Sequence, residues 1–554
     1  MLFWSIELSR FYSKFIHIMF AILGLSMLYS CSSGASCNSD NDDSSTNLNQ
    51  YKNWIESLTA ADYGVIQGNV FLMQNDNCPQ FVSIFNSCFG QNPASPYIIP
   101  QLPIESSYVD PYYAIQFESN TPSGVSVDMF YRLSDTDAMV TVVAYPPKAA
   151  YFGYQSYVFT RESSYYDGIV PPRSRSISPD PSRYDIFGSI GNDINNTIVQ
   201  NQYGRSPWNG SIVMYITTSN QALADALVLN ATNHGINRNS IFIEPVGTNV
   251  MVGKTESADD MLTLIRYAVP ESSNAATSWN STVNENTLVY RISNQQIPVS
   301  RYGQNSYSQH LINNSESNLN VSLEQLSTLL KIYLEQHQPL TISATIAQTL
   351  ATTFDNDVGE PSSGLVGSYC IEYGNDCEGD NQDTSTYATL TESTVFLGPD
   401  EVVFIAGVNH SLPNINNNHY LSLDIYNAVN SSGVASTSKT NLAATGFSSG
   451  NLNGSAQQLL MDLGIVIPAN YTELRNNIGS LYASFVSRNC NNKTIHSASP
   501  YCINLLGDSL VPSNATISIT ERSYVLPGKT TGAYTADMVY PYLIANSSSF
   551  IPNP

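Results

Sequence analysis

The stretch MVTVVAYPPKAAYFGYQSYVF, Met139 to Phe159, decides the fold expected for this chain. Met139 to Tyr145 is apolar almost throughout, as expected of a central strand that is covered on both faces. Pro146 and Pro147 end that strand, because proline cannot donate a hydrogen bond to a sheet ladder. Tyr151 to Phe159 reads as a second strand that returns antiparallel to the first. The pair predicts a sheet-centred core.

A second stretch, Val402 to Tyr426, has the same order of features: an apolar run, a polar break and a strand that begins with tyrosine. Placing Tyr151 on Tyr420 also places Tyr157 on Tyr426. Strand-turn-strand pairs also recur by chance in large sheet proteins, so a weak internal duplication is a hypothesis and not a result.

The region between these stretches contains a strand, a helix and a strand. Ser211 to Thr217 is apolar, Ser219 or Asn220 can cap a helix that runs through Leu229, and Ser240 to Glu244 is apolar again. Such units join parallel strands. The expected fold class is therefore α/β (mixed α+β), with two sheet-centred halves that mix parallel and antiparallel strands.

Four segments are expected along the chain of 554 residues. Residues 1–30 read as a signal peptide or membrane anchor, and residues 31–50 read as a disordered polar tether. Residues 51–295 form an N-terminal mixed sheet domain with the βαβ unit. Residues 296–554 form a C-terminal domain that opens with a helical hairpin: one helix runs from Ser322 to His337, and a second runs through Thr341 to Phe354.

The N-terminus indicates export. Arg10 and Lys14 precede the apolar run Phe15 to Tyr29, which small and polar residues follow. The run is shorter than the roughly 20 apolar residues that a bilayer core requires, which favours a cleaved signal peptide over an anchor. Leu28 to Cys31 also resembles the lipobox of bacterial lipoproteins, although tyrosine in its second place is unusual. All three alternatives predict a secreted or cell-surface protein.

The net charge opposes nucleic-acid binding. With 45 acidic and 22 basic residues, the chain carries a charge of -23. Binding to a phosphate backbone depends on lysine and arginine displacing counterions, so nucleic acid is a poor partner. The membrane is expected to be a partner only through the N-terminal segment.

The cysteines suggest an oxidising compartment. Six lie beyond the N-terminal segment, in three close pairs: Cys78 and Cys88, Cys370 and Cys377, Cys490 and Cys502. Short loops close at the smallest entropic cost, so disulfides within each pair are expected. The chain also has thirteen N-x-S/T glycosylation acceptors, at Asn195, Asn209, Asn230, Asn280, Asn313, Asn320, Asn409, Asn430, Asn453, Asn470, Asn492, Asn514 and Asn546.

One acidic loop is a candidate calcium site. The loop CIEYGNDCEGDNQD contains the candidate ligands Asp376, Glu378, Asp380 and Asp383. Calcium takes six to eight oxygen ligands, and extracellular sites can be weak. The spacing does not follow the EF-hand order, so an exposed acidic turn is the alternative. No other cofactor is expected.

Three further groups are weighed as functional residues. His410 follows the second apolar strand, where active-site residues are often placed, and His419 lies nearby. The tyrosines Tyr145, Tyr151, Tyr154 and Tyr157 could form a sugar-binding or peptide-binding face, but core packing is the more common role.

Gly507 to Leu510 resembles the nucleophile motif of GDSL esterases, and Gly191 to Asp193 resembles their asparagine block. Their order is reversed and no histidine follows, so no catalytic residue is assigned.

Together these features predict an exported, disulfide-stabilised, glycosylated surface or secreted protein with a non-enzymatic binding or structural role. Its expected ligand is an extracellular protein or a carbohydrate. The alternative is an extracellular hydrolase with an acid and histidine site, with or without a metal. A cleft that holds His410 or His419 with two carboxylates would favour the hydrolase.

Overall fold

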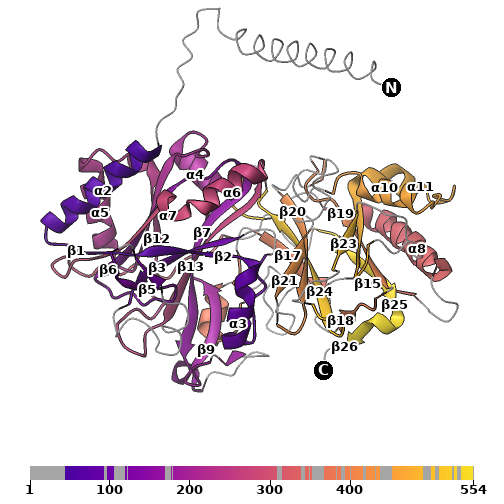
Figure 1. Ribbon diagram of the computed structural model, residues 1–554, viewed down its shortest axis with the longest axis horizontal. Coiled ribbons are helices and arrows are strands. Elements are labelled where there is room, and N and C mark those ends of the chain that lie inside the picture. Colours follow the sequence, from indigo (N-terminus) through magenta and orange to yellow (C-terminus); the bar gives the residue numbers. More distant parts are fainter. Residues whose placement is uncertain are drawn as a thin grey trace, which may run out of the picture. The chain divides into compact units, whose positions relative to one another are not determined.

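The computed structural model of the chain is shown in Figure 1. Its compact unit is Ser44–Pro554. The structure describes residues 44–92, 96–104, 119–121, 123–168, 176–177, 179–308, 315–337, 344–348, 350–351, 367–377, 379–381, 384–388, 393–399, 401–412, 414–415, 420–430, 432–436, 452–490, 501–505, 511–526, 529–532 and 538–552. The predicted signal peptide or anchor lies outside these ranges. Among the described residues, no helix combines the length and the apolar character needed to cross a bilayer.

A five-stranded sheet contains the decisive stretch. Its order is β1 (Gly64–Gln67), β14 (Thr287–Ser293), β6 (Asp137–Ala144), β11 (Ile212–Thr218) and β12 (Ile241–Pro245). Strand β6 is central, and all its residues are buried. Alternate residues of β6 face two different cores, one with Met139 and Val143 and the other with Val140 and Val142. The prediction of a central strand covered on both faces is confirmed.

The prediction that Tyr151 to Phe159 pairs with the strand before it is wrong. Strand β7 (Ala149–Glu162) pairs with β13 (Asp260–Pro270) and β9 (Arg183–Ser189) in a second sheet, because β11 and β14 already occupy both edges of β6. The chain crosses between the sheets after Pro146 and Pro147, and the Tyr145 and Phe152 rings stay 4.5 Å apart. This sheet also contains β2 (Asn69–Met73), β3 (Tyr97–Pro103), β4 (Ser119–Asn120), β5 (Ser126–Asp128), β8 (Ser176–Ile177) and β10 (Ile194–Asn195).

The two sheets pack face to face, and helices cover their outer faces. Between the sheets, the rings of Tyr154 and Tyr215 stack with their centroids 4.2 Å apart. The far side of the five-stranded sheet is covered by α2 (Ser44–Ala60) and α5 (Gln221–Asn233), whose apolar residues share a core with β6. Helix α3 (Cys78–Phe85) packs on the far side of the second sheet. The remaining helices of this part are α4 (Asn196–Tyr203), α6 (Ser273–Ser281) and α7 (Val283–Asn286).

Helix α2 corrects the predicted tether. It begins at Ser44, inside the stretch 31–50 that its polar composition marked as disordered. The helix buries Leu48, Tyr51 and Trp54 against the sheet. The first turn of α2 is mostly polar, and the apolar residues that hold the helix on the sheet follow it in sequence. The composition of the first turn alone therefore does not predict the helix.

The later part of the chain builds a second pair of sheets. One has the order β15 (Ala344–Gln348), β25 (Tyr542–Asn546), β19 (Val402–Val408), β22 (Leu481–Ser487) and β23 (Cys502–Asn504). The other contains β16 (Leu350–Ala351), β17 (Thr384–Ala388), β18 (Ser393–Phe396), β20 (Tyr420–Asn427), β21 (Gly433–Ser436), β24 (Thr516–Tyr524) and β26 (Phe550–Pro552). The helices in this later part of the sequence are α8 (Asn320–His337), α9 (Gly367–Tyr373), α10 (Ser455–Asp462) and α11 (Thr472–Asn477).

The predicted helical hairpin is half right. Helix α8 forms as expected and packs its leucines on the core of the second pair of sheets. The predicted partner helix over Thr341 to Phe354 is wrong, since β15 and β16 occupy that stretch. Its β-branched Thr345 and Ile346 suit a strand, and pairing of β15 with β25 outweighs the helical spacing of the apolar residues.

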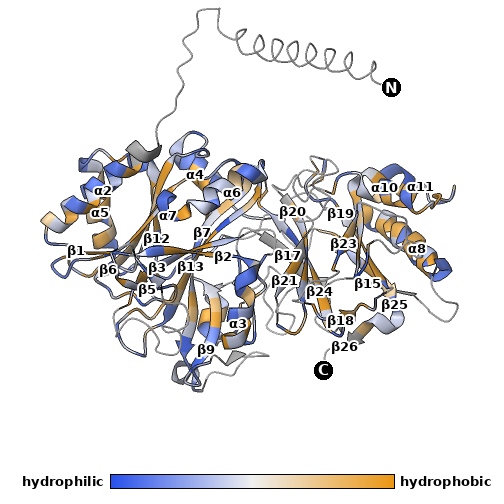
Figure 2. Ribbon diagram, in the orientation of Figure 1, coloured by the Kyte–Doolittle hydropathy of each residue, from blue (hydrophilic) through white to orange (hydrophobic). Residues whose placement is uncertain are grey.

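The strand order repeats, as the two tyrosine-led stretches suggested. Strands β6 and β19 are central and antiparallel to both neighbours, while β12 and β23 run parallel to the strand before them. In each half the next strand, β7 or β20, leaves for the other sheet and pairs with β13 or β24. Apolar colouring concentrates on the strands of both halves, whereas α8 and α10 carry both colours (Figure 2).

Equivalent side chains follow the repeated order. Arg266 lies opposite Gly153 on β7, and Arg522 lies opposite Ser422 on β20. Arg266 stands 5.6 Å from the Tyr157 ring centroid, and Arg522 stands 5.7 Å from that of Tyr426. These are the tyrosines that the sequence comparison superposed. The repeat in strand order therefore includes a specific arginine-tyrosine contact, which supports the hypothesis of an internal duplication.

Candidate functional site

His410 lies between two carboxylates, as the hydrolase alternative required. It follows β19, and its Nδ1 is 2.7 Å from Oε1 of Glu316, which precedes α8. Its Nε2 is 3.0 Å from Oε1 of Glu521 on β24. The Tyr482 hydroxyl donates to Glu521, and the Val539 N–H donates to Glu316 at 2.9 Å. Two segments thus contact the imidazole directly, and two more contact its carboxylate partners.

The His410 cluster is sealed from solvent. The side chain of His410 is 0% exposed, and those of Glu316 and Glu521 are 2% and 0% exposed. Burial by itself would lower the pKa of His410, but the charges of the two carboxylates outweigh it and raise the pKa to about 10. An inaccessible imidazole that stays charged near neutral pH is not placed to take a proton from a substrate, and the geometry of the cluster is that of a structural ion network. His419 lies outside the described residues.

One predicted calcium ligand, Asp380, is engaged in hydrogen bonds within the protein. Both carboxylate oxygens of Asp380 accept hydrogen bonds, from the backbone and hydroxyl of Ser189 and from the Gly367 N–H, at 2.6 to 2.9 Å. Asp376 lies near Asp185 of β9, and burial followed by the Asp376 charge raises the pKa of Asp185 to about 8. Glu378 and Asp383 lie outside the described residues.

No group of three or more His, Cys, Asp or Glu side chains within the described ranges could hold a metal ion. Because two of the four proposed ligands fall outside those ranges, the calcium site stays a prediction.

Three disulfides join the cysteines within their sequence pairs. They link Cys78 to Cys88, Cys370 to Cys377 and Cys490 to Cys502, with Cα atoms 5.4, 6.0 and 5.8 Å apart. Cys370 and Cys377 bracket the end of α9, and the Cys377 N–H donates to the Ile186 carbonyl of β9 at 2.8 Å. The bonds are compatible with an exported protein.

The tyrosines of the decisive stretch are core residues. Tyr145, Tyr151, Tyr154 and Tyr157 are all buried. Tyr151 donates to Asp193, and Tyr154 shares a hydrogen bond with Thr217. They do not form an exposed binding face. The esterase-like stretch Gly507 to Leu510 lies outside the described residues.

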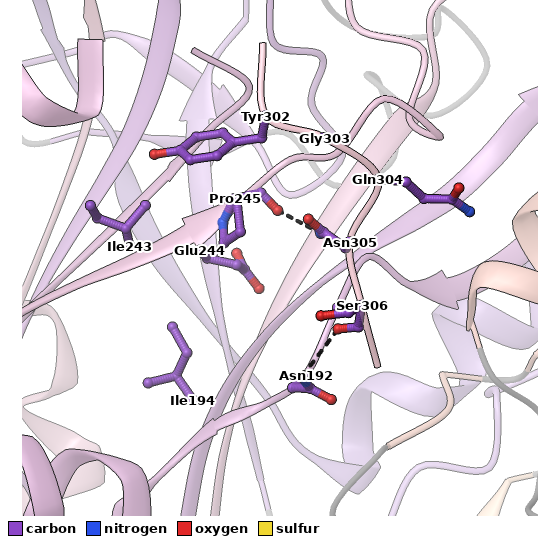
Figure 3. Close-up of a pocket in the computed structure, with 11 residues that line it drawn as sticks. Asn192, Ile194, Ile243, Glu244, Pro245, Tyr302, Gly303, Gln304, Asn305 and Ser306 are labelled. Carbon is purple, nitrogen blue, oxygen red and sulfur yellow. Dashed lines mark hydrogen bonds between the residues drawn. The ribbon is translucent and has the colours of Figure 1, made fainter. Parts of the chain in front are cut away.

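A pocket of about 360 Å³ opens where β12 ends. Ile243, Glu244 and Pro245 come from the last residues of β12, and Gly191, Asn192 and Ile194 come from the segment around β10. The third wall is the loop formed by residues 302–306, which follows β14 (Figure 3). The carboxyl end of a strand in a parallel βαβ unit is where open α/β sheets place their ligands.

Side-chain amides hold the loop formed by residues 302–306 in place. Asn305 donates to the Pro245 carbonyl at 2.7 Å and also to the Ile190 carbonyl. Asn192 donates to the Ser306 carbonyl at 3.3 Å and accepts from the Ser308 N–H at 2.7 Å. Figure 3 shows Asn192 and Asn305 reaching their partners on the same side of the pocket. Of the other residues that line the pocket, Ile194 and Ile243 are apolar, and Tyr302, Gln304 and Ser306 are polar.

Glu244 is the charged residue of this pocket. Its Oε1 accepts from the Ser156 N–H at 2.7 Å, and its Oε2 accepts from the hydroxyls of Ser156 and Thr217 at 2.5 and 2.7 Å. Burial raises the pKa of Glu244 to about 7, although these hydrogen bonds act in the opposite direction. The carboxylate therefore changes charge near neutral pH.

The sequence contained a signal for this pocket that its motifs did not reveal. The βαβ unit was predicted, and Glu244 was assigned to the end of its second strand. The rule that ligands bind at strand carboxyl ends points to that residue. No local pattern shows that the loop formed by residues 302–306 returns to the same edge.

Comparisons with known proteins give no family. No family model and no curated protein matches the chain. Among solved structures, the VPA0106 protein from Vibrio parahaemolyticus matches with 9% identity over 90% of this chain and 96% of its own, at a TM-score of 0.32. An uncharacterised protein from Burkholderia cenocepacia matches with 7% identity over 90% and 87% of the two chains, also at 0.32. Neither similarity is close enough to bear on function.

Proposed function

We propose that this chain is an exported binding protein without an enzymatic role, and that its site is the pocket at the end of β12. The ligand class is a small polar molecule rich in hydroxyl groups, such as a monosaccharide or a polyol. The hydrolase alternative is weaker, because His410, one of its two candidate histidines, is buried.

The composition of the pocket lining supports this proposal. Of the eleven lining residues, Gln304 adds an amide, Tyr302 and Ser306 add hydroxyls and two isoleucines add apolar surface. The Asn192 and Asn305 amides hold the loop formed by residues 302–306. The lining residues include no Lys, Arg, His or Cys. Amides and hydroxyls match a hydroxylated ligand, and the lining places no histidine beside Glu244 to complete an acid and histidine site. An anionic ligand would find no positive charge in this lining.

Blocking the pocket tests the site. Gly303 lines it, and a Cβ added there would meet no atom within 4 Å, so the side chain of Gly303→Trp starts in open space. We expect the variant to weaken ligand binding by at least about tenfold at an unchanged melting temperature. Isothermal titration calorimetry of the purified chain against neutral monosaccharides and polyols measures the effect.

Gly479→Trp is the matched control, since a Cβ at Gly479 also meets open space but lies outside the pocket. Equal binding by both variants would place the site elsewhere. If no member of the panel binds more tightly than about 10 mM, the proposed function is wrong.

The export half of the proposal predicts a pattern of glycans in a eukaryotic secretory host. The exposed acceptors Asn209, Asn320, Asn453, Asn470 and Asn514 are expected to carry sugars. Asn195, Asn409 and Asn546 are buried and their side-chain oxygens accept backbone hydrogen bonds, so a sugar there is incompatible with the fold. Peptide mass spectrometry after enzymatic deglycosylation reads out each acceptor. Occupancy of Asn409 in folded, secreted protein would contradict this pattern.

A further inference from the structure

Glu244 is a buried carboxylate without a counter-charge among the residues that surround it. Its three donors are the Ser156 N–H and the hydroxyls of Ser156 and Thr217, all of them neutral. The lining of the pocket adds no cation, and no ion pair of Glu244 occurs in the described part of the chain. Buried charges in proteins are usually paired, because desolvation is otherwise uncompensated.

Three other buried carboxylates of this half do have a cationic partner. Asp259 pairs with Arg161, Asp260 pairs with Arg132 and Arg183, and Asp137 pairs with Arg291. Glu244 stands apart from these and lines the pocket. A carboxylate has about four acceptor positions, and three are used, which leaves one on Oε1.

The groups that face Glu244 do not supply a positive charge. Tyr154 on β7 and Tyr131 in the segment between β5 and β6 interact with it. Burial raises the pKa of both hydroxyls above the usual value of 10, so both are neutral. Arg291 acts on Tyr131 and is engaged by Asp137 at 3.1 Å. Within the described residues no cation pairs with Glu244, so a bound ligand can supply the positive charge.

We infer that the pocket selects a ligand that carries a protonated amino group beside its hydroxyls, and that Glu244 is the residue that accepts this group. The inference rests on the proposed binding function and sharpens its ligand class to a small amino-polyol or amino sugar. A charge-assisted hydrogen bond in a pocket of low dielectric is stronger than the neutral bond that a hydroxyl would form in its place. Glu244 would thus determine specificity, while Asn192 and Asn305 shape the pocket.

Three matched probes test the inference. Sorbitol, glucamine and gluconate share one carbon chain and differ at one end, which carries a hydroxyl, an ammonium or a carboxylate. Calorimetry of the purified chain near pH 8 is expected to show glucamine binding at least about tenfold more tightly than sorbitol, and gluconate more weakly than both. Glu244→Gln should remove the preference for glucamine and leave sorbitol binding within about twofold.

Glu285→Gln is the control variant, because Glu285 lies exposed on α7 outside the pocket and its loss changes the net charge equally. Should Glu244→Gln fail to fold, the wild-type chain still gives an answer. Its preference for glucamine should decline as the pH is lowered from about 8 to about 6, because Glu244, with a pKa of about 7, takes up a proton while the amine of glucamine stays charged.

The outcomes separate the two proposals. Equal affinity for sorbitol and glucamine in the wild-type chain overturns the role of Glu244 and leaves the binding function in place. A preference for glucamine that persists unchanged in Glu244→Gln also overturns it. If none of the three probes binds and the neutral panel also fails, the binding function itself is wrong.

Discussion

His410→Ala is expected to lower the free energy of unfolding by about 3 to 5 kcal/mol. The substitution leaves Glu316 and Glu521 facing each other in a buried space without the cation that lies between them. It also removes the contact that ties the end of β19 to β24 and to the segment that precedes α8. Denaturant unfolding followed by circular dichroism measures the loss.

The same cluster predicts a pH dependence. The folded-state pKa of His410 is raised from 6.5 to about 10, so its contribution to stability is fully present below pH 6.5 and is lost as the pH rises through 10. The difference in stability between the wild-type chain and His410→Gln should therefore shrink between these limits.

His234→Ala is the control for this prediction, because His234 is exposed at the end of α5 and its ring contacts the Asn230 carbonyl one turn earlier. We expect it to change stability by less than about 0.5 kcal/mol. A loss below about 1 kcal/mol for His410→Ala would show that the cluster does not hold the charged arrangement described above.

Asp259→Ala is expected to cost a similar amount, about 3 to 5 kcal/mol, for a related reason. Arg161 and Asp259 are both 0% exposed and form a two-pronged pair, with N···O distances of 2.7 and 2.5 Å. Arg161 also donates to the carbonyls of Ile371 and Asn249 at 2.9 and 2.8 Å. Without Asp259 the guanidinium stays buried and loses its counter-charge. Chemical denaturation measures the cost.

An exposed pair of the same chemistry provides the comparison. Lys148 and Glu271 lie 2.6 Å apart, but their side chains are 57% and 61% exposed. Glu271→Ala should cost less than about 0.5 kcal/mol, because water screens the pair. A double variant that replaces Arg161 and Asp259 by apolar residues should recover part of the loss, since no unpaired charge remains. If Asp259→Ala and Glu271→Ala cost the same, burial does not set the strength of the Arg161 pair.

Much of the fold is determined by local sequence. The apolar run from Met139 to Tyr145 specifies a strand covered on both faces, because any other placement would expose it to water. The strand, helix and strand between Ser211 and Glu244 form a parallel unit, and the two tyrosine-led stretches mark the repeat. The cysteine spacing selects short disulfide loops. Each of these depends on residues that are close together in the chain.

What depends on distant residues was decided only by the tertiary structure. Residues 344–348 form a strand because β25, about 200 residues later, offers an edge for pairing. Strand β7 joins a second sheet because both edges of β6 are occupied by strands that come later in sequence. His410 lies between Glu316 and Glu521, and Glu244 lines a pocket with residues 302–306, only after the whole chain has folded. A local stretch of sequence shows the periodicity and propensity of one helix or strand. These contacts join segments that are far apart in the sequence, so no local pattern predicts them.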